Sequence, residues 1–379
     1  MKKILVVLMA VLLSQAACAK KLDIKQTPGG KQGSPPAFKL EKSKLGNRYS
    51  FKNLTLIMVN AKSELDAKKY ISLGSALAKK LVEVKETGNV SQLTVSNNSK
   101  EFYIFINAGD IVKGGKQDRT LRYDLIVPPG ASNVPLPSFC VESGRWRQRE
   151  GEDVKKFSSN THALSSRRSR IASKKKGSQG EVWKSVAEQQ ESLNKNIAQD
   201  SGRKVEVRNR KSKSSLQLTL ENKELNKLAA EYKKFFSGVI DKEQEAVGFI
   251  FLVNNQFNTM DVYNSKGLFR ELWSKLLSSA VTEAISEGRK PAAAKSDELL
   301  LQEINSAYNE FFTLVKLNSA TSFKTYENRQ VVMFETIDDE EKKYLHLNII
   351  SKPPEEKVHR KNCIRPVRNR NINSLEETD

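Results

Sequence analysis

A loop with two adjacent glycines holds the residues of this sequence that are best suited to binding an anion. Gly114 and Gly115 precede Lys116, and Arg119 follows close behind. Adjacent glycines let backbone amides approach an anion, and the two basic side chains add positive charge. The loop is not a P-loop, because Gly115 stands where that motif has its lysine. The pattern predicts an anion-binding loop, and the alternative is a tight turn with exposed charges.

Cys140 and the carboxylates around it are the candidates for catalysis. A cysteine is nucleophilic only as the thiolate, which a base or nearby cations such as Arg145 can stabilise. The alternative role is a buried structural cysteine or a disulfide partner. Glu142 is a candidate general acid or base, with Asp110 or Glu181 as its partner. Salt bridges to the many arginines explain these carboxylates equally well.

Two tryptophans offer aromatic walls for the same site. Trp146 follows Arg145, and Trp183 lies two residues after Glu181, so each indole has a charged neighbour for a nucleotide or sugar. Tryptophan more often packs in a core, so a site requires that these segments meet in one cleft. The candidate ligand-binding residues are Gly114, Gly115, Lys116, Gln117, Arg119, Arg145, Trp146, Glu181 and Trp183, and the weaker catalytic candidates are Cys140, Glu142 and Asp110.

The histidines and cysteines do not predict a metal site. His162, His346 and His359 are far apart, and the sequence has no CxxC pair. His346 lies between two leucines of an expected strand, which predicts a solvent-facing or cross-strand residue. Beyond residue 19 the cysteines are Cys140 and Cys363, so a single disulfide and a free, buried Cys140 are both compatible with the sequence. No particular cofactor is indicated.

The first 19 residues have the three-part plan of a secretory signal peptide. A positive start precedes the apolar run from Ile4 to Leu13, and Ala17-Cys18-Ala19 supplies small residues for cleavage before Lys20. A bilayer span needs about 20 apolar residues, more than this run contains. Gln15 argues against a lipoprotein acylated at Cys18. We expect a protein exported to the periplasm or exterior, and no later stretch is apolar enough to span a membrane.

The chain is strongly basic. Its formal net charge is +20, and loss of Lys2 and Lys3 with the signal peptide leaves +18. Such an excess favours anionic partners, namely anionic small molecules, acidic envelope polymers, lipid head groups or nucleic acid. No nucleic-acid-binding motif supports the last of these. General solubility is the alternative explanation of the charge.

Short apolar runs separated by Gly, Pro and Asn turns predict an α+β fold. The N-terminal half is expected to be rich in sheet, as a sandwich or barrel-like unit, and the C-terminal half to mix helices and strands. The expected strands are 54–59, 81–84, 93–95, 102–106, 121–127, 134–141, 246–253, 257–262, 330–336 and 344–350, and the expected helices are 71–80, 180–198, 220–236, one capped at 264–265, and 296–316.

Changes in composition divide the chain. A flexible spacer rich in Gly, Pro and Lys is expected over 20–48, a folded domain over 49–350, and a charged, disordered tail over 351–379. A run of arginines and lysines lies between residues 167 and 176, and it predicts a solvated loop, with an anion-contacting arm as the alternative. Within the domain we distinguish a β-rich part (49–147), a basic insert with helices (148–236) and an α+β part (237–350).

Several segments occur in one order and together resemble a known family. They are Gly114–Arg119 with Val127–Gly130, Cys140–Trp146, Gln179–Trp183, Gly248–Asn254 and Leu268–Trp273. The chain resembles the ARG and Rhodanese-Phosphatase-superfamily-associated Protein domain family over roughly residues 50–350. The family's name reflects gene neighbours and fusions that include ADP-ribosylglycohydrolases, so the resemblance implies a loose connection with NAD-derived ADP-ribose. It implies no activity for particular residues, and this chain departs from that setting by its export signal.

Three hypotheses about function follow from the sequence. The leading one is an exported module that binds a phosphate-like or nucleotide- or sugar-like anion around Lys116, Arg119 and Arg145. The second is a hydrolase acting on a phosphate- or ribose-containing substrate, and the third is a basic envelope protein that adheres to acidic polymers. A specific site requires that the three N-terminal motifs converge in space, whereas adhesion requires only that charge is spread over the surface.

Overall fold

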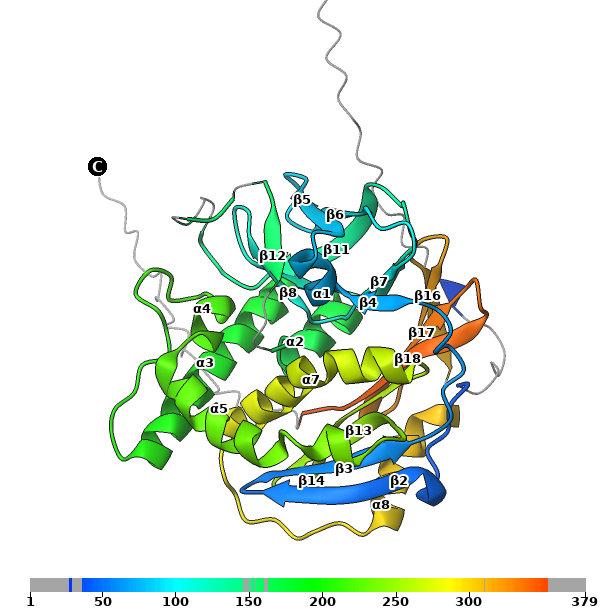
Figure 1. Ribbon diagram of the computed structural model, residues 1–379. Helices are drawn as coiled ribbons and strands as arrows, with labels where there is room; N and C mark the ends of the chain where they lie inside the picture. Colours follow the sequence, from blue (N-terminus) through cyan, green and yellow to red (C-terminus); the bar gives the residue numbers. More distant parts are fainter. Residues whose placement is uncertain are drawn as a thin grey trace, which may run out of the picture.

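The computed structural model describes residues 27–28, 36–145, 149, 151–153, 155–159, 163–309 and 311–353. The expected signal peptide, Trp146, His162, His359 and Cys363 lie outside the described residues. Helices and strands are both abundant, which confirms the predicted α+β class. In Figure 1 a barrel-like group of strands lies above helix α7, and a large sheet lies below it.

The large sheet has nine antiparallel strands, six from the C-terminal half of the chain and three from its N-terminal part. Its order is β1-β15-β16-β17-β18-β14-β13-β3-β2. The predicted hairpin is confirmed: Asn254 and Asn255 turn β13 into β14 with positive φ angles of 51° and 59°. The strands are β1 (Thr27–Pro28), β2 (Leu45–Phe51), β3 (Leu54–Asn60), β13 (Ala246–Val253), β14 (Gln256–Tyr263), β15 (Phe312–Lys316), β16 (Thr321–Glu327), β17 (Val331–Asp338) and β18 (Lys343–Ser351).

The N-terminal half is rich in sheet and barrel-like, as predicted. A six-stranded sheet has the order β12-β8-β9-β11-β6-β5, and a bridge between Lys85 and Lys156 brings its two edge strands together. A three-stranded sheet, β10-β7-β4, lies beside it. The strands are β4 (Tyr70–Ser72), β5 (Val82–Glu86), β6 (Gln92–Asn97), β7 (Tyr103–Ile106), β8 (Ile111–Gly114), β9 (Arg119–Leu121), β10 (Leu125–Val127), β11 (Val134–Cys140) and β12 (Phe157–Ser159).

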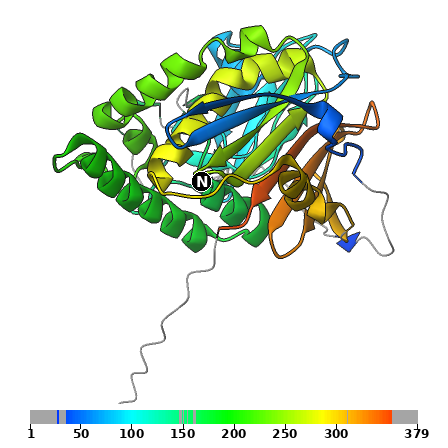
Figure 2. The same ribbon diagram turned by 90° about the horizontal axis from the view of Figure 1, so that it is seen from below.

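Helices cover both faces of the nine-stranded sheet. Helix α7 begins where the Ser265 side chain accepts a hydrogen bond from Leu268 N, and it packs Trp273 edge-on against Phe249 of β13. Figure 2 shows the helices of residues 166–236 gathered at the side of the sheet opposite to β16 and β17. The helices are η1 (Lys42–Lys44), α1 (Leu73–Ala78), α2 (Arg167–Ile171), the π-helix η2 (Ala172–Lys176), α3 (Gln179–Ser201), α4 (Leu216–Leu220), α5 (Lys223–Phe236), α6 (Val239–Lys242), α7 (Lys266–Glu287), α8 (Asp297–Asn305) and η3 (Ser306–Asn309).

Ordered packing begins earlier than the predicted boundary at residue 49. Phe38 and Leu40 are buried in the apolar core on the α8 side of the sheet. Strand β2 then pairs with β3 from Leu45 onward. The prediction of a flexible spacer is therefore wrong for residues 36–48, because two apolar side chains in a polar stretch are enough to anchor it.

Two predicted elements are wrong in extent. The expected helix over 296–316 ends at Asn305, and Phe312–Lys316 is strand β15, which pairs with the unpredicted strand β16. The expected strand over 121–127 is two strands, because β9 pairs with β11 whereas β10 pairs with β7. The short segment between them carries Asp124, whose carboxylate accepts hydrogen bonds from Ala108 N and from the Thr336 hydroxyl.

The basic run over residues 167–176 is not a solvated loop. It forms α2 and the π-helix η2, and both Arg170 and Lys174 are buried. Lys174 Nζ donates to Asn348 Oδ1 at 3.0 Å and lies 4.3 Å from the centre of the Phe334 ring. Charge pattern alone could not show this, because the groups that hold the lysine belong to distant strands of the nine-stranded sheet.

Candidate functional site

The three N-terminal motifs meet at the end of strand β11. Gln117 Nε2 donates to the Glu142 carbonyl oxygen at 3.0 Å, which joins the β8–β9 turn to the segment after β11. The side chain of Gln179, at the first residue of α3, bonds to both backbone groups of Cys140, accepting from its N–H at 2.9 Å and donating to its carbonyl at 2.8 Å. The convergence required for a specific site is therefore present in the geometry.

The two glycines form a tight turn, not an open anion cradle. Gly114 and Gly115 have φ angles of 131° and 56°, and a Cβ atom on Gly114 would lie 2.7 Å from the Lys156 carbonyl oxygen. Their amides already have partners, since Gly114 N donates to Asp118 Oδ1 and Gly115 N to the Asp153 carbonyl. The glycines let the turn pack against β12, and their amides are not available to a ligand.

Cys140 and Arg119 form a buried pair beside this turn. Arg119 is 1% exposed, and its guanidinium contacts Cys140 Sγ at 2.7 Å and Gln117 Oε1 at 3.1 Å, with Glu86 Oε2 3.6 Å away. Burial raises the pKa of the Cys140 thiol, although Arg119 opposes this shift. The thiol is therefore held neutral at physiological pH, as expected of a structural cysteine and not of a nucleophile.

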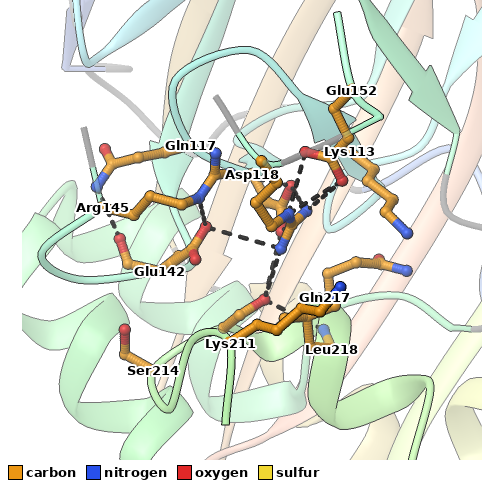
Figure 3. Close-up of polar contacts among 12 residues, drawn as sticks. Lys113, Gln117, Asp118, Glu142, Arg145, Glu152, Lys211, Ser214, Gln217 and Leu218 are labelled. Atoms are coloured by element: carbon orange, nitrogen blue, oxygen red, sulfur yellow. Dashed lines mark hydrogen bonds and ion pairs between the residues drawn. The ribbon is translucent and has the colours of Figure 1, made fainter. Parts of the chain in front are cut away.

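A cluster of ion pairs lies next to these motifs, and we call Asp118, Glu142, Arg145, Arg149 and Glu152 the Glu142 cluster. Arg149 Nη2 donates to both Asp118 oxygens at 2.6 and 2.8 Å, and its Nε donates to Glu152 at 3.0 Å. Arg145 Nε donates to Glu142 Oε2 at 2.6 Å. Figure 3 shows Glu142 and Arg145 on one side of Asp118 and Glu152 on the other.

Two features show that the Glu142 cluster is not saturated. Burial raises the pKa of the Asp118 carboxyl to about 6, with the charge of Glu142 adding to the shift and Arg149 opposing it. Glu142 Oε1 is buried and accepts no hydrogen bond from any described residue. A buried carboxylate oxygen without a donor is costly, so a donor from outside the described residues would be favoured at this atom.

The turn before α4 lies against the Glu142 cluster. Ser215 caps α4 by accepting from Leu218 N at 3.1 Å, and its hydroxyl also lies 3.4 Å from Asp118 Oδ2. Next to it, Gln217 Oε1 is a second buried acceptor without a partner among the described residues. Lys211 and Ser214 of the same segment lie beside these residues (Figure 3), and Lys211 is exposed.

Some predicted site residues are not members of the Glu142 cluster. Lys116 is exposed and lies two residues before Asp118 in the chain, whereas Glu181 pairs at the surface with Lys176 at 2.7 Å. Asp110 pairs with Lys275 of α7 at 2.6 Å, so neither it nor Glu181 is the carboxylate partner of Glu142. That partner is Asp118, because Arg145 and Arg149 each approach both carboxylates. Trp183 is half-buried, with an Nε1 atom that has no described partner.

A second buried cluster joins the two halves of the fold, and we call Asp124, His346, Asp261, Asn348 and Lys174 the His346 cluster. His346 Nδ1 lies 2.7 Å from Asp124 Oδ2, and its Nε2 lies 3.1 Å from Asp261 Oδ1. Asn348 donates to Asp261 at 2.8 Å. The prediction that His346 is solvent-facing or a simple cross-strand residue is wrong, since its ring is 1% exposed and held by two carboxylates.

The pKa shifts within the His346 cluster favour paired charges. Burial alone would lower the pKa of His346, but Asp124 and Asp261 raise it above its ordinary value. Burial alone would raise the pKa of Asp124, but His346, Lys174 and Thr336 hold it far below its ordinary value. Burial lowers the pKa of Lys174 to about 8. No side-chain atom of these five residues is buried without a partner.

The sequence comparison identifies the family. The family model described as the ARG and Rhodanese-Phosphatase-superfamily-associated Protein domain matches residues 42–351. The chain belongs to this family. The match covers the barrel-like strands and every strand of the nine-stranded sheet except β1, so the family domain includes the Glu142 and His346 clusters together. No curated protein and no solved structure matches the chain.

Sequence reasoning missed several residues of the family domain that complete the site. Asp118 lies inside the Gly114–Arg119 motif, and Gln179 begins the Gln179–Trp183 motif, so attention to polar residues within the motifs would have included both. Arg149 belongs to a dense run of charges with no distinguishing pattern. Ser215 carried a recognisable signal, because a serine before an apolar run is a common helix cap.

The described part of the family domain offers neither a metal site nor a membrane span. Among the described residues, no group of three or more His, Cys, Asp and Glu side chains is arranged to hold a metal ion. No described helix combines the length and the apolar character needed to cross a bilayer.

Proposed function

We propose that this protein is an exported binding module for a small phosphorylated or nucleotide-like sugar, and that the ligand binds at the Glu142 cluster. A hydroxyl group of the ligand donates to Glu142 Oε1, and its anionic group lies near Arg145 and the basic rim formed by Lys116 and Lys211. Export rests on residues 1–19, and the ligand class rests on the composition of the cluster.

The observation that carries the proposal is the buried oxygen of Glu142. It accepts no hydrogen bond from a described residue, although the opposite oxygen of the same carboxylate is bonded to Arg145 at 2.6 Å. A structural ion pair gains little from burying one carboxylate oxygen without a donor. A ligand hydroxyl supplies the missing donor, and sugars carry several of them.

The charges of the cluster explain why a hydroxyl is needed in addition to an anion. Its three carboxylates outnumber its two guanidiniums, and those guanidiniums are already bonded to carboxylates. A bare anion would meet Asp118 and Glu142 at close range. A ligand with both groups can direct the hydroxyl to Glu142 and leave its anionic group among the exposed cations, where water lowers the cost.

Thermal unfolding of the chain from Lys20 onward tests the proposal. The probes are ribose 5-phosphate, glucose 6-phosphate and ADP-ribose, with ribose and inorganic phosphate as the separate halves. A ligand that binds only the folded state stabilises it by about 2.7 kcal/mol at 100 times its Kd. We expect phosphorylated sugars to raise Tm more than either half alone.

Glu142→Gln should abolish this rise in Tm, and Glu181→Gln should leave it intact. The second variant makes the same chemical change at an exposed carboxylate that pairs with Lys176. Small and equal increases for every polyanion, erased by moderate salt in both variants, would overturn the proposal and leave non-specific adhesion.

Hydrolysis is a second candidate function, and the raised pKa of Asp118 favours it. A carboxyl with a pKa of about 6 can donate a proton near neutral pH, and Glu142 nearby can accept one. The candidate reaction is cleavage of a phosphate or glycosidic bond in the same ligand. Turnover of a bound phosphorylated sugar, lost in Asp118→Asn while binding persists, would establish it, and binding without turnover would exclude it for that ligand.

A further inference from the structure

A separate pocket lies between the start of α2, the middle of α3 and the end of α7. Its volume is about 440 Å³, which is within the size range of small-molecule sites. Gln189 of α3 lines it, ten residues along the helix from Gln179, which places the two on the order of 15 Å apart. The pocket is thus distinct from the Glu142 cluster.

The inner wall of the pocket contains polar groups that have no partner among the described residues. Gln189 is 6% exposed, and its Oε1 atom is buried and accepts no hydrogen bond from a described residue. Arg167 is also buried, and its Nε has no described partner, although its two terminal nitrogens bond to Ser351 and Glu287 at 2.9 and 2.6 Å. One free acceptor and one free donor therefore lie in the same wall.

The acidic side of the pocket is formed by two carboxylates of α7. Glu283 accepts a hydrogen bond from Arg167 N, and Glu287 accepts from the Arg167 guanidinium. Burial raises the pKa of Glu287, and the charge of Glu283 adds to the shift while Arg167 opposes it. A cationic group in the pocket would relieve this repulsion between the two carboxylates.

The mouth of the pocket is mainly basic. Arg168, Lys195 and Lys290 line it together with Glu188, and both lysines are exposed. Neither lysine forms an ion pair with a described residue, and Arg168 approaches Glu188 only at 3.8 Å. A pure anion entering here would meet the carboxylates of α7 at the inner wall, and a pure cation would have to pass the basic mouth.

We propose that this pocket binds a small zwitterion of the amino-acid type. Its ammonium group donates to Gln189 Oε1 and to Glu287, and its carboxylate lies between Arg168 and Lys290. Each end of such a ligand meets the opposite charge, and the ammonium gives Gln189 the donor that it lacks. The inference is independent of the function proposed for the Glu142 cluster.

Isothermal titration of the chain from Lys20 onward tests this inference with alanine, glutamine and dialanine as probes. N-acetylalanine lacks the ammonium group, and alaninamide lacks the carboxylate. We expect at least one zwitterion to bind with a Kd below about 10 mM, and both blocked derivatives to bind at least about tenfold more weakly. Equal binding of zwitterionic and blocked forms, or no binding of any zwitterion, would overturn the proposal.

Two variants locate the binding site. Gln189→Leu preserves the size of the side chain and should weaken binding about tenfold, whereas Gln199→Leu on the exposed part of the same helix should not. Lys290→Ala changes an exposed side chain, so folding is not at risk, and it should weaken binding about threefold relative to the exposed control Lys234→Ala. Unchanged affinity in both Gln189→Leu and Lys290→Ala would place the zwitterion elsewhere and reject the assignment.

Discussion

The His346 cluster and the Glu142 cluster are both buried networks of charge, but only one of them is complete. In the first, the imidazole lies between two carboxylates, and Lys174 and Asn348 join the same network. In the second, Glu142 Oε1 accepts no hydrogen bond from a described residue, and burial raises the pKa of Asp118 to about 6. The complete network holds layers of the fold together, and the incomplete one is the place where we propose that a ligand binds.

The positions of the two clusters agree with this difference. The His346 cluster lies where the nine-stranded sheet meets the segment between β9 and β10 and the π-helix η2, so its bonds connect three parts of the chain. The Glu142 cluster lies where the β8–β9 turn, the end of β11 and the segment before α4 meet. The exposed Lys116 is two residues from Asp118 in the sequence, and the exposed Lys211 lies beside the cluster in Figure 3.

Removing one charge from the His346 cluster should cause the largest loss in the free energy of unfolding. Asp124→Asn leaves a buried histidine with one carboxylate fewer, and breaking a buried pair in this way costs about 3–5 kcal/mol. Urea unfolding at neutral pH measures the loss. A loss below about 1 kcal/mol would show that the cluster does not hold the layers together.

The two aspartates should respond to pH in opposite directions. The folded pKa of Asp124 is depressed, so its stabilising contribution is present above its ordinary pKa and is lost as the pH falls. The folded pKa of Asp118 is raised to about 6, so the stability linked to it is present below pH 4 and is lost as the pH rises through 6.

Asp118→Asn removes this pH-dependent loss. The stability difference between the variant and the wild-type protein should grow by on the order of 2 kcal/mol in favour of the variant as the pH rises from 4 to 6.5, with little further change above that. Urea unfolding at four or five pH values within that window measures the difference. A constant difference across the window would contradict the assigned ionisation of Asp118.

The smallest effect on stability is expected at the exposed Lys116. Lys116→Ala changes an exposed side chain, so the free energy of unfolding should change by less than about 0.5 kcal/mol. Binding of a phosphorylated sugar should weaken slightly, and the difference should disappear in high salt. A large loss of stability would show that Lys116 belongs to the buried network.

Local patterns predicted much of the fold. The apolar runs of β13 and β14, the Asn254-Asn255 turn and the Ser265 cap are contained within a few residues, and the structure confirms them. The burial of Lys174 could not be predicted in this way, because its partner Asn348 lies 174 residues further along the chain. The prediction of a solvated loop over residues 167–176 is wrong because a charge pattern carries no information about long-range contacts.

The candidate site was predicted in outline and missed in detail. The motifs around Gly114, Cys140 and Gln179 do converge, but their basic and amide groups bond mainly to one another and to neighbouring carboxylates. Asp118 lies within a predicted motif, but its pairing with Arg149 could be recognised only after the turn and the segment after β11 had been placed together. Gly114 and Gly115 serve the turn and not a ligand, because their amides already have acceptors.

Urea unfolding of Glu142→Gln with and without ribose 5-phosphate tests most directly whether the Glu142 cluster is completed by a ligand. We expect the variant without ligand to change by less than about 1 kcal/mol, because the glutamine amide keeps an acceptor for Arg145 and Asp118 remains 3.6 Å from that guanidinium, and we expect it to gain no stability from the sugar phosphate. The wild-type protein should gain stability as the concentration of ribose 5-phosphate rises. A loss of several kcal/mol in the variant, with no ligand effect in either protein, would show that the cluster is purely structural.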